Sequence, residues 1–319
     1  MNIKLSYILV GLTLSASFLS SCGKQKNKSG RTDTYSSGVI SFASDESFNP
    51  IVEDERQVFE HQYTQAKVNP IYTSESEGIK MLLDSKVCLM ITARDFKKAE
   101  LQNLKDRRFM PRAIKLAYDG LALIVNKNNT DTCISVNDIK RILNGSAKKW
   151  SDINPKSHRG EITLVFDNDR SSAVHYMEDS LLGGKAITSP NVAAVKKTSE
   201  VLSYVEKDPG AIGVIGSNWL TDKGDTTNLT FNKKIRVMRV SKLPKATPQN
   251  SYLPYQYYIL MGQYPLVRTI YGLLNDPYNG LPWGFAHFIE SPTGQRIIMR
   301  AGLLPVMGEI NIRNVNVSE

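Results

Sequence analysis

The sequence predicts an α/β protein built on mainly parallel sheets. Short β-type runs alternate with helix-type stretches along residues 38–215, as is typical of strand–helix–strand units. Apolar residues make up 41%, aromatic residues 8% and charged residues 22% of the 319 residues. These values are those of a globular chain large enough for two lobes, and they exclude disordered, collagen-like and multi-span membrane proteins.

The elements follow from periodicity and from stop signals. We expect strands at residues 38–43, 69–73, 87–92, 121–125, 162–166 and 212–215. Helices are expected at 51–62, 75–83, 172–182 and 199–206, the last ended by Pro209 and Gly210. A further helix should begin after Ser135, because Ser135 and Asp138 have the spacing of a capping box, and should end at Gly145.

The N-terminal residues 1–22 predict a signal peptide. Lys4 precedes a mostly apolar run, residues 7–19, that is too short and too rich in Ser to span a bilayer comfortably. The segment 19–23, with Cys22, resembles a bacterial lipobox, which implies a lipidated Cys22; the alternative is an ordinary secretory signal with an incidental Cys. Residues 23–37 are expected to form a flexible tether.

The charge balance indicates only broadly which kinds of partner the protein binds. Forty Lys and Arg against 31 Asp and Glu leave a formal net charge of +9, spread along the chain. Such an excess suits an anion-binding protein, a membrane-surface protein or a nucleic-acid binder. The sequence has no zinc-finger spacing, heptad run or aromatic RNA-binding motif, so we expect no nucleic-acid partner.

Three strand-to-helix junctions carry Ser residues: 44–48, 73–76 and 167–172. A helix N-terminus offers free N–H groups and the positive end of the helix dipole, and the carboxyl ends of strands in an open α/β sheet converge. Together the junctions could form one oxyanion site. The alternative is that each Ser only caps its helix, as Ser74 would in a capping box with Glu77.

Several segments resemble, in order, the phosphate-binding proteins of bacterial ABC importers, particularly their compact lipoprotein members. The helix–Gly–basic–Trp segment that ends at Trp150 is the most specific of them. The matching segments are Asp45–Pro50, Tyr72–Gly78, Ile91–Phe96, Tyr118–Asn126, Ile139–Trp150, Asp208–Gly213 and Phe288–Pro305.

The resemblance implies a two-lobed periplasmic-binding-protein fold of type II with two chain crossovers. Lobe one would comprise residues 38–120 and 255–319, and lobe two residues 121–254. The protein would be a monomer, anchored by lipid on the periplasmic side of the cell envelope. It would capture inorganic phosphate or a similar oxyanion and deliver it to an ABC transporter permease, without enzymatic activity, cofactor or metal. The alternative is a sensor or scaffold lipoprotein with the same fold and an altered cleft.

The resemblance also implies ligand-binding residues, carried over by position. They are Ser47, Phe48 (through its backbone N–H), Ser76, Thr92, Asn168, Arg170 and Ser171. The family has an Arg in the fourth-strand loop where this chain has Asp167. We therefore hypothesise that Arg94 supplies the cation and that Asp167 or Asp95 accepts the ligand proton. The alternative is that Arg94 pairs with a carboxylate across the cleft.

Other constellations are weaker. Ser171 or Ser172 with His175 could suggest a hydrolase, but no Gly-x-Ser-x-Gly elbow is present. The four His lack metal-ligand spacing. The Tyr residues between 252 and 264 suit strand and hinge packing, or else a sugar-stacking platform. Cys88 and Cys133 could be a disulfide or two free thiols.

Overall fold

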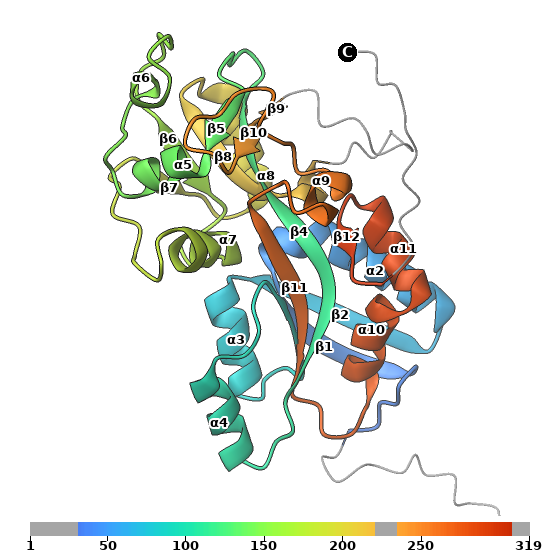
Figure 1. The fold of residues 1–319 in the computed structure, drawn as a ribbon. Coiled ribbons are helices and arrows are strands. Elements are labelled where there is room, and N and C mark those ends of the chain that lie inside the picture. The colour runs from blue at the N-terminus through green and yellow to red at the C-terminus, as the bar shows by residue number, and fades with distance from the viewer. Residues whose placement is uncertain (1–30, 221–234, 308–319) are drawn as a thin grey trace, which may run out of the picture.

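One long strand, β4 (Arg112–Asn126), runs through both halves of the protein (Figure 1). The computed structural model describes residues 31–220 and 235–307, so the expected signal peptide and Cys22 lie outside the described residues. Residues 112–120 of β4 pair with β11 (Val267–Leu274) and, at residues 117–118, with the short β12 (Leu304–Pro305), whereas residues 121–126 pair with other strands. The change of partner along β4 divides the molecule into two lobes.

Lobe one is a five-strand arrangement covered on both faces. Its strand order is β2 (Ala66–Thr73), β1 (Gly38–Asp45), β3 (Leu89–Thr92), β11 and β4; the first three are parallel, and β11 is antiparallel to both of its neighbours. One face packs on α2 (Asn49–Gln62), α10 (Leu281–Glu290) and α11 (Pro292–Arg300). The other packs on α3 (Glu75–Leu83) and α4 (Lys98–Asp106).

Lobe two continues the same sheet. The second half of β4 pairs with β8 (Ala211–Gly216) and β9 (Ile235–Val237), followed by β6 (Thr163–Phe166) and β7 (Val192–Ala194). Helix α8 (Thr198–Lys207) covers one face through Val201 and Val205. The other face packs on α5 (Val136–Leu143), α6 (Trp150–Ile153) and α7 (Ser172–Tyr176). The smaller elements are β5 (Cys133–Ser135), β10 (Arg239–Ser241), α9 (Gln256–Leu260) and β12 (Leu304–Pro305).

The structure confirms the two-lobed α/β fold class. The sheet is mixed, however, and not mainly parallel as expected. Strands β1, β2 and β3 of lobe one, and β6, β7 and β8 of lobe two, are parallel within their lobe. Strand β11 is antiparallel to β3 and β4, and β4 is antiparallel to β8, β9 and β12. Helix α3 has the predicted bounds, and α5 begins with the predicted capping box, in which Asp138 N–H donates to Ser135 Oγ at 3.0 Å. The helix expected at 172–182 is split. It comprises α7 and a π-helical turn, η3 (Met177–Leu181).

Residues 31–37, assigned to the tether from sequence, pack on lobe one. Arg31 Nε donates to Asp33 at 2.7 Å, and Arg31 Nη1 donates to the buried Asp276 at 3.0 Å. The Asp33 carboxylate also accepts from the Leu281 N–H, so this short segment is held by charge-assisted bonds that its composition does not reveal.

The two cysteines within the described residues are not bonded to each other. Cys88 lies in lobe one and Cys133 begins β5 in lobe two, and both are free thiols. Between residues 31 and 307, leaving aside 221–234, no helix has the length and hydrophobicity needed to cross a bilayer.

Candidate functional site between the lobes

The carboxyl ends of four strands meet where the lobes touch. β1 ends at Asp45 and leads into η2 (Glu46–Phe48), and β3 ends at Thr92. From lobe two, β6 is followed by Asp167, and β8 by η4 (Ser217–Trp219). Chain segments that leave parallel strands at one edge form the usual ligand position of an open α/β sheet. This position is where the predicted Ser residues gather.

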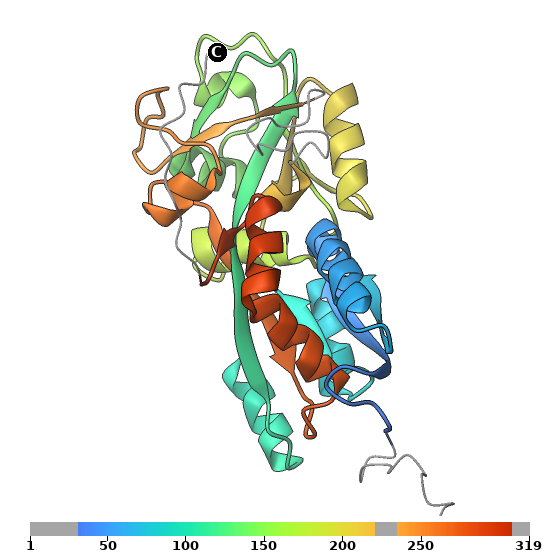
Figure 2. The same cartoon turned by 90° about the vertical axis from the view of Figure 1, so that its right-hand side faces the viewer.

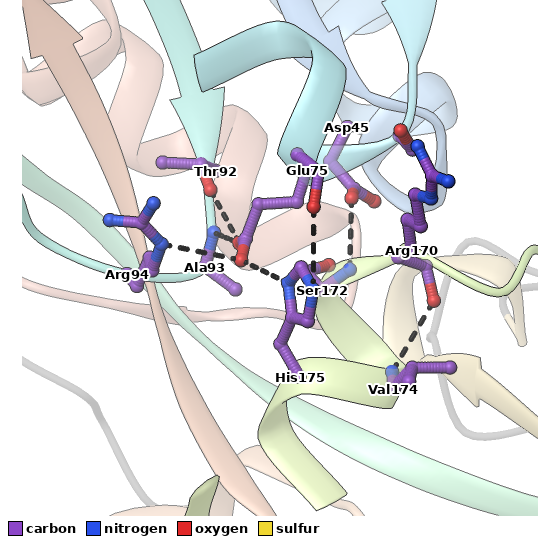
Figure 3. A network of polar contacts seen from close by, with 12 residues as sticks. Asp45, Glu75, Thr92, Ala93, Arg94, Arg170, Ser172, Val174 and His175 are labelled. Carbon is purple, nitrogen blue, oxygen red and sulfur yellow. Dashed lines mark hydrogen bonds and ion pairs between the residues drawn. The ribbon is translucent and has the colours of Figure 1, made fainter. Parts of the chain in front are cut away.

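Asp45 bonds groups of both lobes. Its Oδ1 accepts from the Ser47 N–H at 2.9 Å and from the Ser47 hydroxyl at 2.5 Å. Its Oδ2 accepts from the Ser172 N–H of lobe two at 3.1 Å (Figure 3). The carboxylate is fully buried, and this burial raises its pKa, with the Arg268 charge acting in the opposite direction.

Arg268 is the cation at the centre of this site. It projects from β11 and is only 3% exposed. Its Nε lies 2.9 Å from Asp119 Oδ2, its Nη1 donates to the Ser172 hydroxyl at 2.7 Å, and its Nη2 donates to the Ser47 hydroxyl at 3.2 Å. The guanidinium also lies over the Phe48 ring, 4.6 Å from its centroid. One buried guanidinium therefore joins hydroxyls of both lobes.

Two more buried carboxylates flank Arg268. Asp119 Oδ1 accepts from the Ser217 N–H at 2.9 Å and from its hydroxyl at 2.8 Å. Asp167 Oδ1 accepts from the Asn168 N–H, whereas its Oδ2 has no hydrogen-bond partner among the described residues. Burial, and next the nearby Asp45 charge, raise the pKa of Asp167 to about 7. Among the described residues, Arg268 is therefore the cation that several buried acids surround, and of these acids Asp167 keeps a proton at mildly acidic pH.

A second cluster lies beside the first, around the buried Glu75 at the start of α3. Thr92 Oγ1 donates to Glu75 Oε2 at 2.6 Å, and the Ala93 N–H donates to the same oxygen at 3.2 Å. His175 Nδ1, from α7 of lobe two, lies 2.8 Å from Glu75 Oε1 (Figure 3). The hydrogen bonds from His175 and Thr92 hold the pKa of Glu75 below its usual value despite burial.

Arg94 belongs to this second cluster. Its Nη1 and Nη2 bond Glu100 at 2.8 and 2.7 Å, and its Nε lies 3.5 Å from Glu75 Oε1. It therefore pairs with carboxylates, as the alternative interpretation expected, but with carboxylates of its own lobe and not across the cleft. Arg268, which was not among the residues predicted from sequence, is the cation that contacts Ser47.

The remaining predicted residues have separate places. Ser171 is buried and caps α7 by accepting from the Val174 N–H, and Ser76 Oγ lies 3.4 Å from His175 Nε2. Asn168 accepts from the Arg170 N–H within its own turn, and Arg170 is exposed. The ring of Phe48 packs in the core of lobe one.

Further hydrogen bonds close the lobes on each other. Glu46 Oε2 accepts from the Thr198 N–H at 2.9 Å and from the Thr198 hydroxyl at 2.7 Å, at the start of α8. Asn218 Nδ2 and Trp219 Nε1 both donate to the Ser47 carbonyl, at 3.1 and 2.8 Å. The structure is thus a closed form in which side chains of lobe one satisfy backbone donors of lobe two.

The geometry offers no hydrolase centre or metal site among the described residues. The Ser171 and Ser172 hydroxyls bond the Val174 N–H and Arg268, and His175 is held by Glu75 instead. Across 31–220 and 235–307, no three His, Cys, Asp or Glu side chains are grouped so that they could hold a metal ion.

The chain is similar to one protein-family model and to a phosphate-binding protein. A family model for the PBP superfamily domain matches residues 28–293. The phosphate-binding protein PstS of Staphylococcus aureus is 25% identical over 244 residues, which cover 76% of this chain and 72% of that protein.

Two solved structures share the fold. One, from Clostridium perfringens, is described as a phosphate ABC transporter substrate-binding protein with bound phosphate; it has a TM-score of 0.71 and 21% identity, covering 85% of this chain and all of that one. The other is an ABC-type phosphate transport receptor from Vibrio cholerae, with a TM-score of 0.62, 20% identity, and coverage of 84% of this chain and 100% of that one.

Proposed function

The chain belongs to the PBP superfamily, and on that basis we propose that it is an extracytoplasmic lipoprotein that captures phosphate or a similar oxyanion between its lobes. It then delivers the ion to an ABC permease and carries out no chemical turnover. The lipid anchor is Cys22, on the periplasmic side of the cell envelope. The relatives named for phosphate binding support the ligand class.

One observation carries the proposal: Arg268 joins the Ser47 and Ser172 hydroxyls at a buried point between the lobes. When the lobes part, the Asp45–Ser172 bond breaks and the Ser172 N–H loses its acceptor. The freed N–H, the two hydroxyls and the guanidinium are then donors for the oxygens of a tetrahedral anion. Closure around the ion restores a full set of bonds to these buried donors.

The acids of the site define which oxyanion fits. Asp45 and Asp167 lie beside the proposed donors, and each, when ionised, accepts a hydrogen bond from a protonated ligand oxygen and repels an unprotonated one. Phosphate and arsenate keep at least one proton at neutral pH, whereas sulfate keeps none. Protonated tetrahedral oxyanions are therefore favoured over sulfate.

A scaffold or sensor role is the second candidate, and one observation favours it. The Glu46 carboxylate already occupies the start of α8, and the Asp45 carboxylate bonds the Ser172 N–H, so the lobes close through groups of the chain itself. A protein that closes in this manner can present one fixed surface to an envelope partner without a small ligand.

Calorimetric titration separates the two. The chain from Gly23 to Glu319 keeps every described residue; it is refolded to remove bound ligand and titrated with phosphate, arsenate, sulfate and molybdate. We expect phosphate to bind with a Kd of roughly 1 μM or tighter, about −8 kcal/mol, and sulfate far more weakly. If only sulfate gives a heat of binding, the ligand is sulfate and not phosphate. If none of the four ions binds, the scaffold role is favoured.

A further inference from the structure

The turn between α4 and β4 exposes a large apolar side chain among cations. Met110 is 80% exposed, and Lys105, Arg107 and Arg108 before it are also exposed. Arg108 has a left-handed backbone, with φ of 64°, which ends α4 and turns the chain toward β4. An apolar tip flanked by Lys and Arg is the composition of segments that bind at a lipid–water interface.

Neighbouring elements extend the cationic surface. Arg107 donates to the Leu83 carbonyl and, at 2.9 Å, to the Ser85 hydroxyl, which places the α3–β3 turn beside the α4–β4 turn. That turn adds the exposed Lys86. The exposed acids beside these four cations are Asp84 and Asp106, so positive charge is in excess. We call this region the basal surface: residues 84–86 and 105–110.

The N-terminal segment enters the structure at the same end. Arg31 bonds the Asp276 carboxylate at 3.0 Å, and the Asp276 carbonyl accepts from Arg112, the first residue of β4, at 3.3 Å. Figures 1 and 2 show the α4–β4 turn and the start of the described chain at the end of lobe one away from lobe two. A surface hollow of about 390 Å³, lined by residues that include Arg31, Val39 and Lys86, lies between the start of the described chain and the α3–β3 turn.

The length of the preceding chain relates this end to the proposed anchor. From Cys22 to Arg31 the chain can span at most about 30 Å, and it carries Lys24, Lys26 and Lys28. A lipid on Cys22 therefore holds the basal surface close to the bilayer. One lipid anchor plus a basic patch is also the combination that gives stable membrane attachment.

We propose that the basal surface of lobe one lies on the anionic headgroups of the membrane, with Met110 inserted between them. The orientation in the cell rests on the proposed lipidation of Cys22, but the lipid contact itself does not. With lobe one against the bilayer, lobe two points away from it. Exposed turns with an excess of positive charge are attracted to a negatively charged lipid surface.

Vesicle binding by the chain from Gly23 to Glu319, which has no anchor, tests the contact. We expect cosedimentation with phosphatidylglycerol vesicles, little with phosphatidylcholine, and loss of binding in high salt. Changing Lys86, Lys105 and Arg108 together to Gln should weaken binding roughly tenfold or more. The matched control changes three exposed lobe-two cations, Lys127, Lys148 and Lys149, to Gln, and should alter binding less than about twofold.

A Met110→Trp variant reports insertion, and its added emission should shift to shorter wavelength with phosphatidylglycerol vesicles. Equal losses in the two triple variants, no shift in Met110→Trp, or binding only to vesicles that contain a permease would each overturn the proposal. Phosphate titration of the same samples separates the two proposals. If the protein binds phosphate but not vesicles, only the proposed membrane contact is rejected. If it binds vesicles but not phosphate, only the proposed ligand is rejected.

Discussion

The Arg268 guanidinium donates to the Ser172 hydroxyl over 2.7 Å and thereby joins β11 of lobe one to α7 of lobe two. Both side chains are buried, at 3% and 1% exposure. A hydrogen bond from a charged donor in such a place is stronger than one between neutral groups at the surface. Because this contact joins the lobes, a group that bonds Arg268 in place of Ser172 also changes how the two lobes are held together.

Removing the Ser172 hydroxyl should weaken phosphate binding. In Ser172→Ala, Arg268 Nη1 loses its acceptor and the ligand loses a donor, so the Kd should rise roughly tenfold, about 1.4 kcal/mol. Calorimetry measures the change. Ser203→Ala, on the exposed face of α8, is the matched control and should bind like the wild type. Equal affinities in all three proteins would remove Ser172 from the site.

The Glu75–His175 contact should make lobe closure depend on pH. The hydrogen bond to Glu75 raises the pKa of His175 above 6.5, although burial opposes it. The stabilisation that protonated His175 gives to closure is therefore fully present below about pH 6.5 and is lost as pH rises through the folded pKa. Glu178 favours the protonated ring, while Lys97 disfavours it.

Trp219 can report this closure, since its Nε1 bonds the Ser47 carbonyl across the lobes. A Trp283→Phe background avoids the signal of Trp283, which stacks on His287 at 4.5 Å. We expect Trp219 emission to change as pH rises above 6.5 through the raised folded pKa of His175, and His175→Gln to remove that transition. An identical transition in the variant would show that another group controls closure.

Ionisation of Asp167 should destabilise the folded state. Its folded pKa of about 7 exceeds the unfolded value of 3.8, so the folded state binds more protons between these limits. Its contribution is present below about pH 4 and is lost as pH rises to about 7. Between about pH 5 and pH 8, the free energy of unfolding should fall by roughly 2–3 kcal/mol less in Asp167→Asn than in the wild type.

Urea unfolding at the two pH values gives this difference. Asp84→Asn, an exposed position, provides the control and should follow the wild type. If Asp167→Asn loses as much stability with pH as the wild type does, Asp167 is already ionised in the folded protein at acidic pH.

Replacing Glu55 should stabilise lobe one. This side chain is 1% exposed, borders an apolar cavity of about 20 Å³, and neither carboxyl oxygen has a partner among the described residues. Burial raises its pKa to about 9, so its cost grows as pH rises from about 4.5 through 9. Glu55→Leu should raise the unfolding free energy by about 1–2 kcal/mol near pH 7.

Glu55→Gln separates charge from polarity at this position. The amide does not ionise, so its stability relative to Glu55→Leu should not change with pH, while its unpaired polar atoms should keep it less stable. A loss of stability in Glu55→Leu, as measured by urea unfolding, would indicate that Glu55 has a partner, such as a buried water in the cavity.

The elements that local signals determine were predictable. Ser74 and the apolar spacing that follows it gave the bounds of α3, and the Ser135–Asp138 pair gave the start of α5. The position of the site was also predictable, because the carboxyl ends of parallel strands converge wherever such a sheet forms. The Ser junctions at residues 44–48 and 167–172 accordingly meet.

The central cation could not be predicted in this way. Arg268 reaches the site because β11 inserts between β3 and β4, a pairing of segments about 150 residues apart, as in the Arg268–Asp119 bond. No local pattern determines that pairing. One signal was available, namely a lone Arg in an otherwise uncharged strand. Arg94 lies at the expected loop, but Glu100, six residues later, binds it.

The affinity of an Arg268→Lys variant for phosphate tests the central claim most directly. Lys keeps the charge but cannot bond Asp119, Ser172 and Ser47 together, so the Kd should rise at least roughly a hundredfold, about 2.7 kcal/mol. Arg94→Gln should bind phosphate with an affinity close to that of the wild type, and cooperative urea unfolding of all three proteins would show that each is folded. Tight binding by Arg268→Lys together with its loss in Arg94→Gln would contradict the account and assign the ligand's cation to Arg94.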